Sequence, residues 1–234
     1  WYFMNNEKIT AFLPCRKGSQ RVPKKNIKPF AGYDFGLIQI KLKQLIDAQT
    51  IDKIILSTND TEILDYASSL NNPKIVCHHR AEFLATSQTS TDDLVGHALD
   101  LIPKGHILWT HVTSPFVNAE LYDQIIQQYQ TVLQEGYDSL MTTNLIHGFL
   151  WNEKGPINYD RTKEKWPRTQ TLEPIHEINS AVFLANSEIY QTLDDRIGQN
   201  PCLYPLDKIQ GFDIDWGDDF KIAQAIIQSR ITNL

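Results

Sequence analysis

The chain has few of the features that mark exported, metal-stapled or membrane proteins. Its 234 residues include three cysteines, an odd number without C-x-x-C spacing, which argues against a disulfide framework and a zinc ribbon. No apolar run approaches the roughly 18 residues of a membrane span, and no signal-peptide pattern is present. We therefore expect a protein of a reducing compartment, the cytoplasm, with no membrane partner.

Acidic residues are missing from one stretch of an otherwise acidic chain. The net charge of −6 argues against a general nucleic-acid binder. No Asp or Glu occurs between Glu7 and Asp34, and a local positive field inside an acidic protein suits a small polyanion better than a long one. We call residues 16–28 the cationic loop; its charged residues are Arg16, Lys17, Arg21, Lys24, Lys25 and Lys28.

Short β-rich runs alternate with amphipathic stretches of helical period, which predicts a single α/β domain over residues 4–234. Trp1, Tyr2 and Phe3 precede Met4 and are expected to be additions outside that domain. Strands separated by helices of this length predict a three-layer, Rossmann-like, mainly parallel sheet. Ligands bind such sheets at the carboxyl ends of the strands. Strands are predicted at 9–13, 53–58, 74–77, 106–112, 139–143, 181–185 and 212–215, and helices at 36–48, 61–70 (with Thr61 as N-cap), 92–102, 118–133 and 218–231.

Residues 144–178 break this alternation. They are rich in Pro, Trp, Lys and His and show weak periodicity. A segment of this length is too long for an ordinary loop in a compact domain, so a functional or interface arm is expected. A mobile surface insertion is the alternative.

The cationic loop directly follows the first predicted strand, which places it at the ligand-binding edge. Gly18 allows positive φ and close approach of backbone N–H groups to a phosphate. Arg16 can fork onto two phosphate oxygens, while Lys25 supplies a mobile point charge. The loop matches neither the Walker A pattern nor the dinucleotide fingerprint G-x-G-x-x-G. A solvated basic loop without a ligand is the alternative interpretation.

Asp213 and Asp215 form the second candidate site. On a strand, residues two apart share a face, so both carboxylates can share a cation. Mg²⁺ favours one or two carboxylates completed by substrate phosphates and water, an arrangement that suits nucleotidyl transfer. Alternatively, Asp213 ends a strand and Asp215 caps the last helix, although Asp218 or Asp219 lies nearer that helix.

The motif Arg-x-Gly-Ser-x-Arg-x-Pro-x-Lys-Asn, residues 16–26, resembles the signature loop of the acylneuraminate cytidylyltransferase family, the CMP-sialic acid synthetases and their relatives. The related CMP-Kdo synthetases usually carry Pro at the position of Asn26, which favours the nonulosonate branch. Further resemblances follow in family order over nearly the whole chain: Ser57-Thr58-Asn59-Asp60, Arg80, Thr113-Ser114-Pro115, Asn179-Ser180-Ala181-Val182-Phe183 and Asp213-Ile214-Asp215.

The resemblance implies the nucleotide-diphospho-sugar transferase fold, and CTP and an acidic sugar as substrates. It implies that Arg16 and Lys25 are catalytic and bind phosphates, and that Asp215, also catalytic, holds Mg²⁺ with Asp213. Nucleotide contacts are expected from Gly18, Ser19 and Asn26 as well, and Arg80 is expected to read cytosine together with hydroxyls of residues 86–91. It also implies a homodimer joined through the arm. Sugar contacts are expected from His111, Thr113, Ser114, Arg168, Gln170, Asn179 and Phe183, with Arg168 and Gln170 reaching the partner's site.

Departures from the family pattern concern mainly the sugar. His111 stands where the family commonly has Gln, and Phe116-Val117 replaces Leu-Arg. No convincing match to the family's sugar-carboxylate Lys follows Met141. Three readings therefore stay open: a nonulosonate cytidylyltransferase, a nucleotidyltransferase for another pair such as CMP-Kdo synthesis, and a nucleotide-binding homologue that has lost its sugar site.

Overall fold

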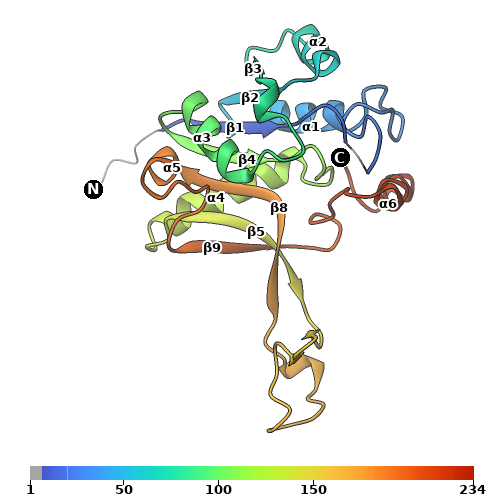
Figure 1. Ribbon diagram of the computed structural model, residues 1–234, viewed down its shortest axis with the longest axis vertical. Helices are drawn as coiled ribbons and strands as arrows, with labels where there is room; N and C mark the ends of the chain where they lie inside the picture. The colour runs from blue at the N-terminus through green and yellow to red at the C-terminus, as the bar shows by residue number, and fades with distance from the viewer. Residues whose placement is uncertain (1–6, 20) are drawn as a thin grey trace.

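A computed structural model describes residues 7–19 and 21–234 (Figure 1). The elements alternate as the sequence predicts. In chain order they are β1 (Ile9–Pro14), α1 (Gly36–Asp47), β2 (Lys53–Thr58), α2 (Thr61–Ser69), β3 (Ile75–His79), η1 (Glu82–Leu84), α3 (Thr91–Leu101), β4 (His106–Thr110), α4 (Ala119–Leu133), β5 (Ser139–Ile146), β6 (Trp151–Asn152), β7 (Gly155–Pro156), η2 (Thr169–Thr171), β8 (Ile175–Asn186), α5 (Ser187–Leu193), β9 (Pro201–Leu206) and α6 (Gly217–Gln228).

The main sheet has seven strands in the order β3-β2-β1-β4-β8-β5-β9. β1 pairs in parallel with both β2 and β4, whereas β8 runs antiparallel between β4 and β5. The chain leaves β1 in one direction toward β2 and later returns to its other side as β4. This reversal makes a crevice at the carboxyl ends of β1 and β4, where open α/β sheets bind ligands. The predicted α/β, mainly parallel fold is confirmed.

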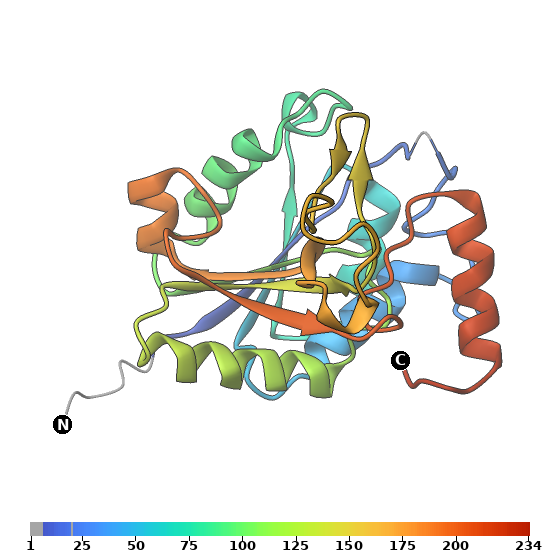
Figure 2. The ribbon, with the colours of Figure 1, turned by 90° about the horizontal axis from the view of Figure 1, so that it is seen from below.

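Helices cover both faces of the sheet, which gives the predicted three layers (Figure 2). One apolar cluster joins the sheet to α1, α2, α4 and α6, and a second joins the opposite face to α3 and α5. The alternation of side chains along β8 illustrates the division, because Val182 packs in the first cluster and Phe183 in the second.

Polar residues fix several helix starts. The Asn118 side chain accepts a hydrogen bond from the backbone N–H of Leu121 at the start of α4. At α2 the N-cap is Asp60, whose side chain accepts from the Glu62 N–H, so the assignment of Thr61 as N-cap was one residue late. Capping accounts for Asp60 at the end of β2 without a catalytic role.

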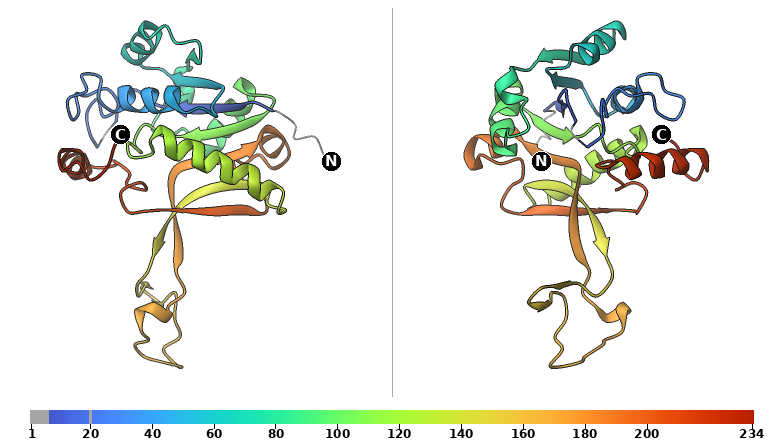
Figure 3. Two further views of the ribbon diagram at one scale, coloured as in Figure 1. Left: turned by 180° about the vertical axis from the view of Figure 1, so that it is seen from behind. Right: turned by 45° about the vertical axis from the view of Figure 1, so that its right-hand side comes forward.

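An arm projects from the body of the molecule and stands apart from it in several views (Figures 1 and 3). Its base is a two-stranded ribbon in which the ends of β5 and β8 pair, down to Ile146 opposite Ile175. The prediction of irregular structure over 144–178 was therefore wrong at both ends, where long-range pairing decides the structure. The short β6–β7 hairpin and η2 occupy the remainder.

Further elements and boundaries differ from the sequence-based prediction: α5 was not predicted, and β4 ends at Thr110 instead of residue 112. Residues 212–215 pair with no strand and form an extended loop, whereas β9, which was not predicted, completes the edge of the sheet beside β5. α6 ends at Gln228 instead of residue 231. Among the described residues, no helix combines the length and apolar character that crossing a membrane requires.

Candidate functional site

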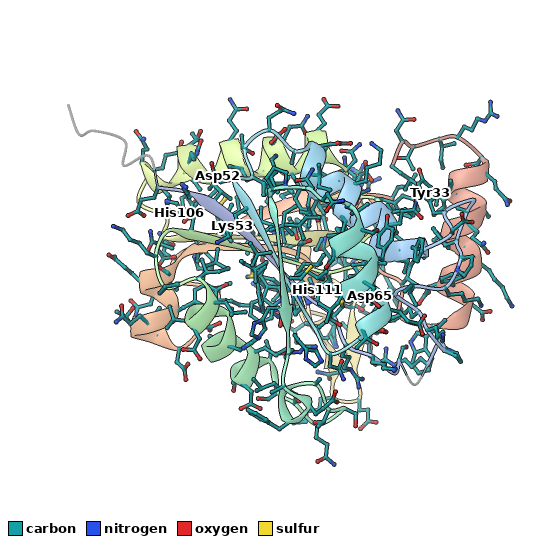
Figure 4. The ribbon with its side chains drawn as sticks, turned by 90° about the horizontal axis from the view of Figure 1, so that it is seen from above. Tyr33, Asp52, Lys53, Asp65, His106 and His111 are labelled. Carbon is teal, nitrogen blue, oxygen red and sulfur yellow. The ribbon has the colours of Figure 1, made fainter. Side chains whose placement is uncertain are left out.

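A cleft of about 410 Å³ opens at the carboxyl ends of β1 and β4. Its walls are the start of the cationic loop, residues 111–113 after β4, Ser87 before α3, and Asp215 before α6. Figure 4 labels His106 and His111, which mark the two ends of β4, with His111 near the middle of the molecule. The cleft therefore lies where the sheet topology predicts a ligand.

The cationic loop is held mainly through its backbone, and of its cations Lys17 is exposed whereas the Lys25 side chain is largely buried. Gly18 has φ of +83°, the left-handed conformation that glycine adopts without strain. The Lys17 N–H donates to the Asn59 side chain at 2.9 Å, and the Ile38 N–H of α1 donates to the Asn26 carbonyl at 2.8 Å. The Val22 N–H donates to Ser19 Oγ at 3.3 Å. Fixed ends with exposed cations are suited to binding an anion.

Four predicted nucleotide residues line the cleft: Arg16, Ser19, Lys25 and Asn26. Gly18 lies beside them on a smaller hollow. Lys25 is the most constrained, because its Nζ donates to the Ile214 carbonyl at 2.8 Å and lies 3.7 Å from an Asp215 oxygen. Burial lowers its pKa, and the nearby carboxylates of Asp215 and Asp213 oppose that shift.

Arg21 also lines the cleft, and the sequence analysis did not assign it to the site beyond its place in the loop. Its Nη1 lies 3.1 Å from an Asp215 oxygen, and its guanidinium stacks 4.7 Å from the centre of the Trp216 ring. The loop after β1 is thus tied to the start of α6, about 190 residues later in the chain.

Asp213 and Asp215 flank a fully buried Ile214, so both carboxylates leave the core on the same side although no paired strand forms here. The Ile214 N–H donates to the Thr113 carbonyl at 2.9 Å, which ties the pair to the segment after β4. Burial raises the pKa of Asp213, and the charge of Asp215 adds to this. Asp219 accepts hydrogen bonds from the N–H groups of Asp215 and Trp216, as expected of the residue nearer the helix.

These two carboxylates fit a divalent cation. They are hard oxygen donors beside a cluster of cations that suits phosphates, and the charge of Asp215 adds to the energetic cost of charging Asp213. Among the described residues there is no group of three or more His, Cys, Asp or Glu that could hold a metal by itself. Any cation here would therefore depend on substrate oxygens to complete its shell.

Arg80 lies beneath the cleft, directly after β3, with 2% of its surface exposed. Its Nη2 donates to the Cys15 carbonyl at 2.7 Å, whereas Nε and Nη1 have no hydrogen-bond partner among the described residues. A buried guanidinium with unused donors is costly unless something accepts from them. Cys15 itself is packed in the core, where burial raises its pKa to about 11, so a reactive thiol is not indicated.

His111 lines the cleft as a neutral ring. Its Nδ1 donates to the Ser180 carbonyl at 2.7 Å, so Nε2 is the acceptor for Trp109 Nε1–H at 3.3 Å. Burial lowers the pKa of His111 to about 4, with the charge of Arg196 among the causes. His111 therefore contributes hydrogen-bonding surface but no charge.

Lys41 of α1 is fully buried and holds the segment after β4. Its Nζ donates to the carbonyls of Ser114 and Val117 and to the Tyr122 hydroxyl. That hydroxyl lies 2.6 Å from Thr110 Oγ1, which donates to the Ala181 carbonyl. Each of these five contacts needs one proton. The Tyr122 and Thr110 hydroxyls supply two, so the Lys41 amine must supply three, which it does only when it is charged. Burial lowers the pKa of Lys41, and the three acceptors offset that cost.

This network accounts for Ser114, a predicted sugar contact. Ser114 is buried and offers its carbonyl to Lys41, whereas Thr113 lines the cleft. Asn179 is likewise committed, because its side chain bonds Thr142, Asn144 and the Ala181 N–H. Both residues shape the walls through internal bonds.

The next residues along β8 also lie away from the cleft lining. Ser180 has φ of +58° beside the register shift in the β5–β8 ladder, a conformation that suits the Gly of the family motif. Phe183 is 3% exposed, because the guanidinium of Arg196 lies 3.6 Å from its ring centre. Arg168 and Gln170 lie on the arm, outside the residues that line the cleft.

A mainly parallel sheet with a cation-rich loop after β1 and carboxylates near it is the arrangement expected of a nucleotide-binding α/β protein. Comparison with known proteins gives the family. The sequence profile described as "Cytidylyltransferase" matches residues 10–195, and the chain belongs to this family.

Relatives and solved structures extend over nearly the whole chain. Pseudaminic acid cytidylyltransferase of Campylobacter jejuni serotype O:2 is 23% identical over 94% of this chain and 96% of its own. N-acylneuraminate cytidylyltransferase of Escherichia coli O18:K1:H7 is 25% identical over 95% of this chain, which spans 53% of that longer protein. In fold, the chain is similar to CMP-2-keto-3-deoxy-manno-octonic acid synthetase complexed with CTP (TM-score 0.67, 13% identity, 96% and 100% coverage). It is also similar to 4-diphosphocytidyl-2C-methyl-D-erythritol synthase of Anaerococcus prevotii (TM-score 0.69, 14% identity, 96% and 97% coverage).

Proposed function

We propose that this protein transfers CMP from CTP to an acidic 2-keto sugar of the nonulosonate class and releases pyrophosphate. The observation that carries the proposal is the meeting of the cationic loop and Asp215 at one cleft, with Asp213 two residues from Asp215 and with Arg80 bonded to Cys15 behind the cleft wall. The family match supplies the reaction class, and relatives named for pseudaminic acid and N-acylneuraminate support the class of sugar.

In this proposal the triphosphate lies over Gly18 and Ser19, with Arg16 and Lys25 on its β- and γ-phosphates. The anomeric hydroxyl oxygen of the sugar forms a bond to the α-phosphorus while the bond from that phosphorus to the bridging oxygen breaks. Pyrophosphate leaves with the electron pair, and Arg16 and Lys25 stabilise its charge. The hydroxyl proton passes to Asp215, the carboxylate on the cleft wall.

Asp213 and Asp215 would hold Mg²⁺, which supplies Lewis-acid neutralisation of phosphate charge when bound. Arg21 and Lys25 neutralise Asp215 in the protein without substrate. Conversion of either aspartate to Asn should lower both activity and the affinity for Mg²⁺ measured by calorimetry with CTP. An Asp215→Asn variant with unchanged Mg²⁺ affinity and full activity would remove this assignment.

The arm suits a contact between two copies of the chain. Trp151, Ile157 and Trp166 are 49%, 54% and 63% exposed on it, far more than apolar side chains of this size usually are. A homodimer would bring Arg168 and Gln170 to the partner's cleft. Sedimentation of the wild type and of a Trp151→Ser/Trp166→Ser variant tests this.

We place the enzyme in the bacterial cytoplasm, since all three cysteines are free thiols.

The base assignment is tested at Arg80. Its Nε and Nη1 donors are unused but buried behind Cys15 of the cleft wall, so contact with the carbonyl edge of cytosine requires a local shift of that wall. We expect Arg80→Met to raise the KM for CTP by about 10- to 100-fold, because a charge-assisted hydrogen bond to the base is lost. Comparison of CTP with UTP, ATP and GTP is the second readout. Preference of the wild type for another nucleotide would favour a transferase for a different pair.

A further inference from the structure

Arg196 lies directly after α5 and crosses two aromatic rings. Its guanidinium carbon is 3.6 Å from the centre of the Phe183 ring and 4.8 Å from that of Trp109. Among residues 7–19 and 21–234, no carboxylate lies within ion-pair distance of it. The adjacent Asp195 carboxylate instead accepts the backbone N–H groups of Arg196 and Ile197. The Arg196 guanidinium is therefore stacked and rigid, and all its N–H donors are unused.

A short chain of contacts joins Arg196 to the cleft. Trp109, beneath the guanidinium, donates its Nε1–H to His111 Nε2 at 3.3 Å, and His111 lines the cleft. Trp109 and His111 are two residues apart along β4 and so lie on the same side of the sheet. The positive charge of Arg196 acts on the His111 ring, as does that of Lys25 on the opposite wall. Arg196 is not among the residues that line the cleft; the Trp109 ring lies between it and His111 on the cleft wall.

An acidic acceptor needs a cation that the triphosphate does not occupy. His111 is neutral, since its Nδ1–H is bonded to Ser180 and its Nε2 accepts from Trp109. The three protons of Lys41 are all donated inside the core. Lys25 is bonded to Ile214 and lies beside Asp215. Of the cations that act on His111, Arg196 alone among the described residues keeps its donors unused.

We propose that Arg196 is the specificity-determining residue that receives the carboxylate of the acidic sugar. The guanidinium fork matches a carboxylate with two parallel hydrogen bonds. Stacking on Phe183 and Trp109 fixes the orientation of this fork before the sugar arrives, so little side-chain entropy is lost on binding. Phe183 then supports the Arg196 guanidinium and does not itself touch the sugar. This inference rests on the proposed function, since it assigns a subsite for the acid beside the same cleft, next to His111.

The test compares an acid with its uncharged analogue. Pseudaminic acid and N-acetylneuraminic acid, each beside its C1 carboxamide, are titrated calorimetrically into protein saturated with CMP, and KM values for each acid and for CTP are measured. The variants are Arg196→Met, which keeps an apolar stem over the rings without the charge, and Arg196→Lys, which keeps the charge without the fork. Arg230→Met, on the exposed C-terminal end of the chain, removes the same charge elsewhere and is the control.

For the acid that the wild type uses, Arg196→Met should raise Kd and KM by about 10- to 100-fold, while the KM for CTP changes less than about twofold. Wild-type preference for the acid over the carboxamide should disappear. The Kd and KM of Arg196→Lys for the acid should lie between those of the wild type and those of Arg196→Met. The values of Arg230→Met should match those of the wild type. Unchanged acid affinity in Arg196→Met, or in Arg196→Lys if the Met variant does not fold, overturns the proposal. Equal rises in the KM for CTP and for the acid also overturn it, since they mark a packing residue. Absence of pyrophosphate release by the wild type refutes the proposed function instead, and the calorimetric comparison still decides Arg196.

Discussion

The two walls of the cleft are built in opposite ways. The wall after β1 is fixed mainly through its backbone and lines the cleft with the cationic side chains of Arg16, Arg21 and Lys25. The wall after β4 uses its polar groups for internal hydrogen bonds: the Ser114 carbonyl accepts from Lys41, and the His111 ring bonds to Ser180 and Trp109. The first wall can meet a highly charged ligand by side-chain charge. The wall after β4 presents a rigid surface of fixed shape. Such a surface suits a sugar ring, which is itself uncharged and carries few charged groups.

Lys25→Met should give the largest effect on activity. Lys25 faces both the proposed phosphates and Asp215, and its Nζ holds the Ile214 carbonyl. We expect kcat/KM for CTP to fall by about 100- to 1000-fold, as for other fixed donors to transition-state charge. Lys17→Met is the matched control, because its exposed side chain belongs to the same loop and carries the same charge. Equal losses in both variants would mean that the loop acts through net charge alone.

Lys41→Met removes the buried amine that holds the wall after β4. Two carbonyls and the Tyr122 hydroxyl would lose their buried donor, which should lower the free energy of unfolding by about 3 kcal/mol. Lys43→Met is the control on the same helix; its exposed pair with Asp47 should contribute less than about 0.5 kcal/mol. Urea unfolding measures both. A loss at Lys41 no larger than at Lys43 would refute the five-proton network.

The neutral ring of His111 predicts a pH dependence of stability. Its folded pKa, about 4, lies below the ordinary value of 6.5, so below pH 6.5 the unfolded chain binds the proton first. Stability from this group is therefore full above pH 6.5 and is lost as pH falls toward 4. We expect a loss of about 1–2 kcal/mol, less than the full linkage because the ring is partly open to the cleft. His111→Gln should flatten this part of the profile; an identical profile in that variant would contradict the assignment.

Ser180→Gly gives the smallest expected effect. Ser180 adopts φ of +58° at the β5–β8 register shift, and glycine relieves that strain at some cost in chain entropy. We expect a net gain of about 0.5 kcal/mol in thermal or urea unfolding. The same change at Ser69, in the last turn of α2, should lower stability by a similar amount. Destabilisation at Ser180 would show that its side chain does more than fill the bulge.

The same contrast explains how much of the molecule could be predicted from the sequence. The first wall is one contiguous stretch, so Arg16, Lys25 and the loop between them could be found from composition and spacing. The second wall is assembled from α1, β4, β8 and the segment after α5, and no local pattern links Lys41 or Arg196 to it. For the fold, the alternation of apolar periods predicted the succession of elements from β1 to β5 correctly, whereas α5 and β9 were missed.

Prediction failed where long-range pairing overrides local pattern. β9 and the ribbon of the arm form because β5 offers them an edge, which their own residues do not reveal. Residues 212–215 have the alternation of a strand but find no pairing partner; their side chains still alternate, because Ile214 is anchored in the core. Only Asp215 of the two lines the cleft, so a shared cation site stays a prediction.

The most direct test of the account is the release of pyrophosphate by the wild-type protein from CTP with Mg²⁺ and a panel of acids that includes pseudaminic acid, N-acetylneuraminic acid and Kdo. The account predicts stoichiometric pyrophosphate and CMP-sugar with CTP and at least one nonulosonic acid, and little release when CTP is replaced by ATP, GTP or UTP. No release from CTP with any acid in the panel would contradict it.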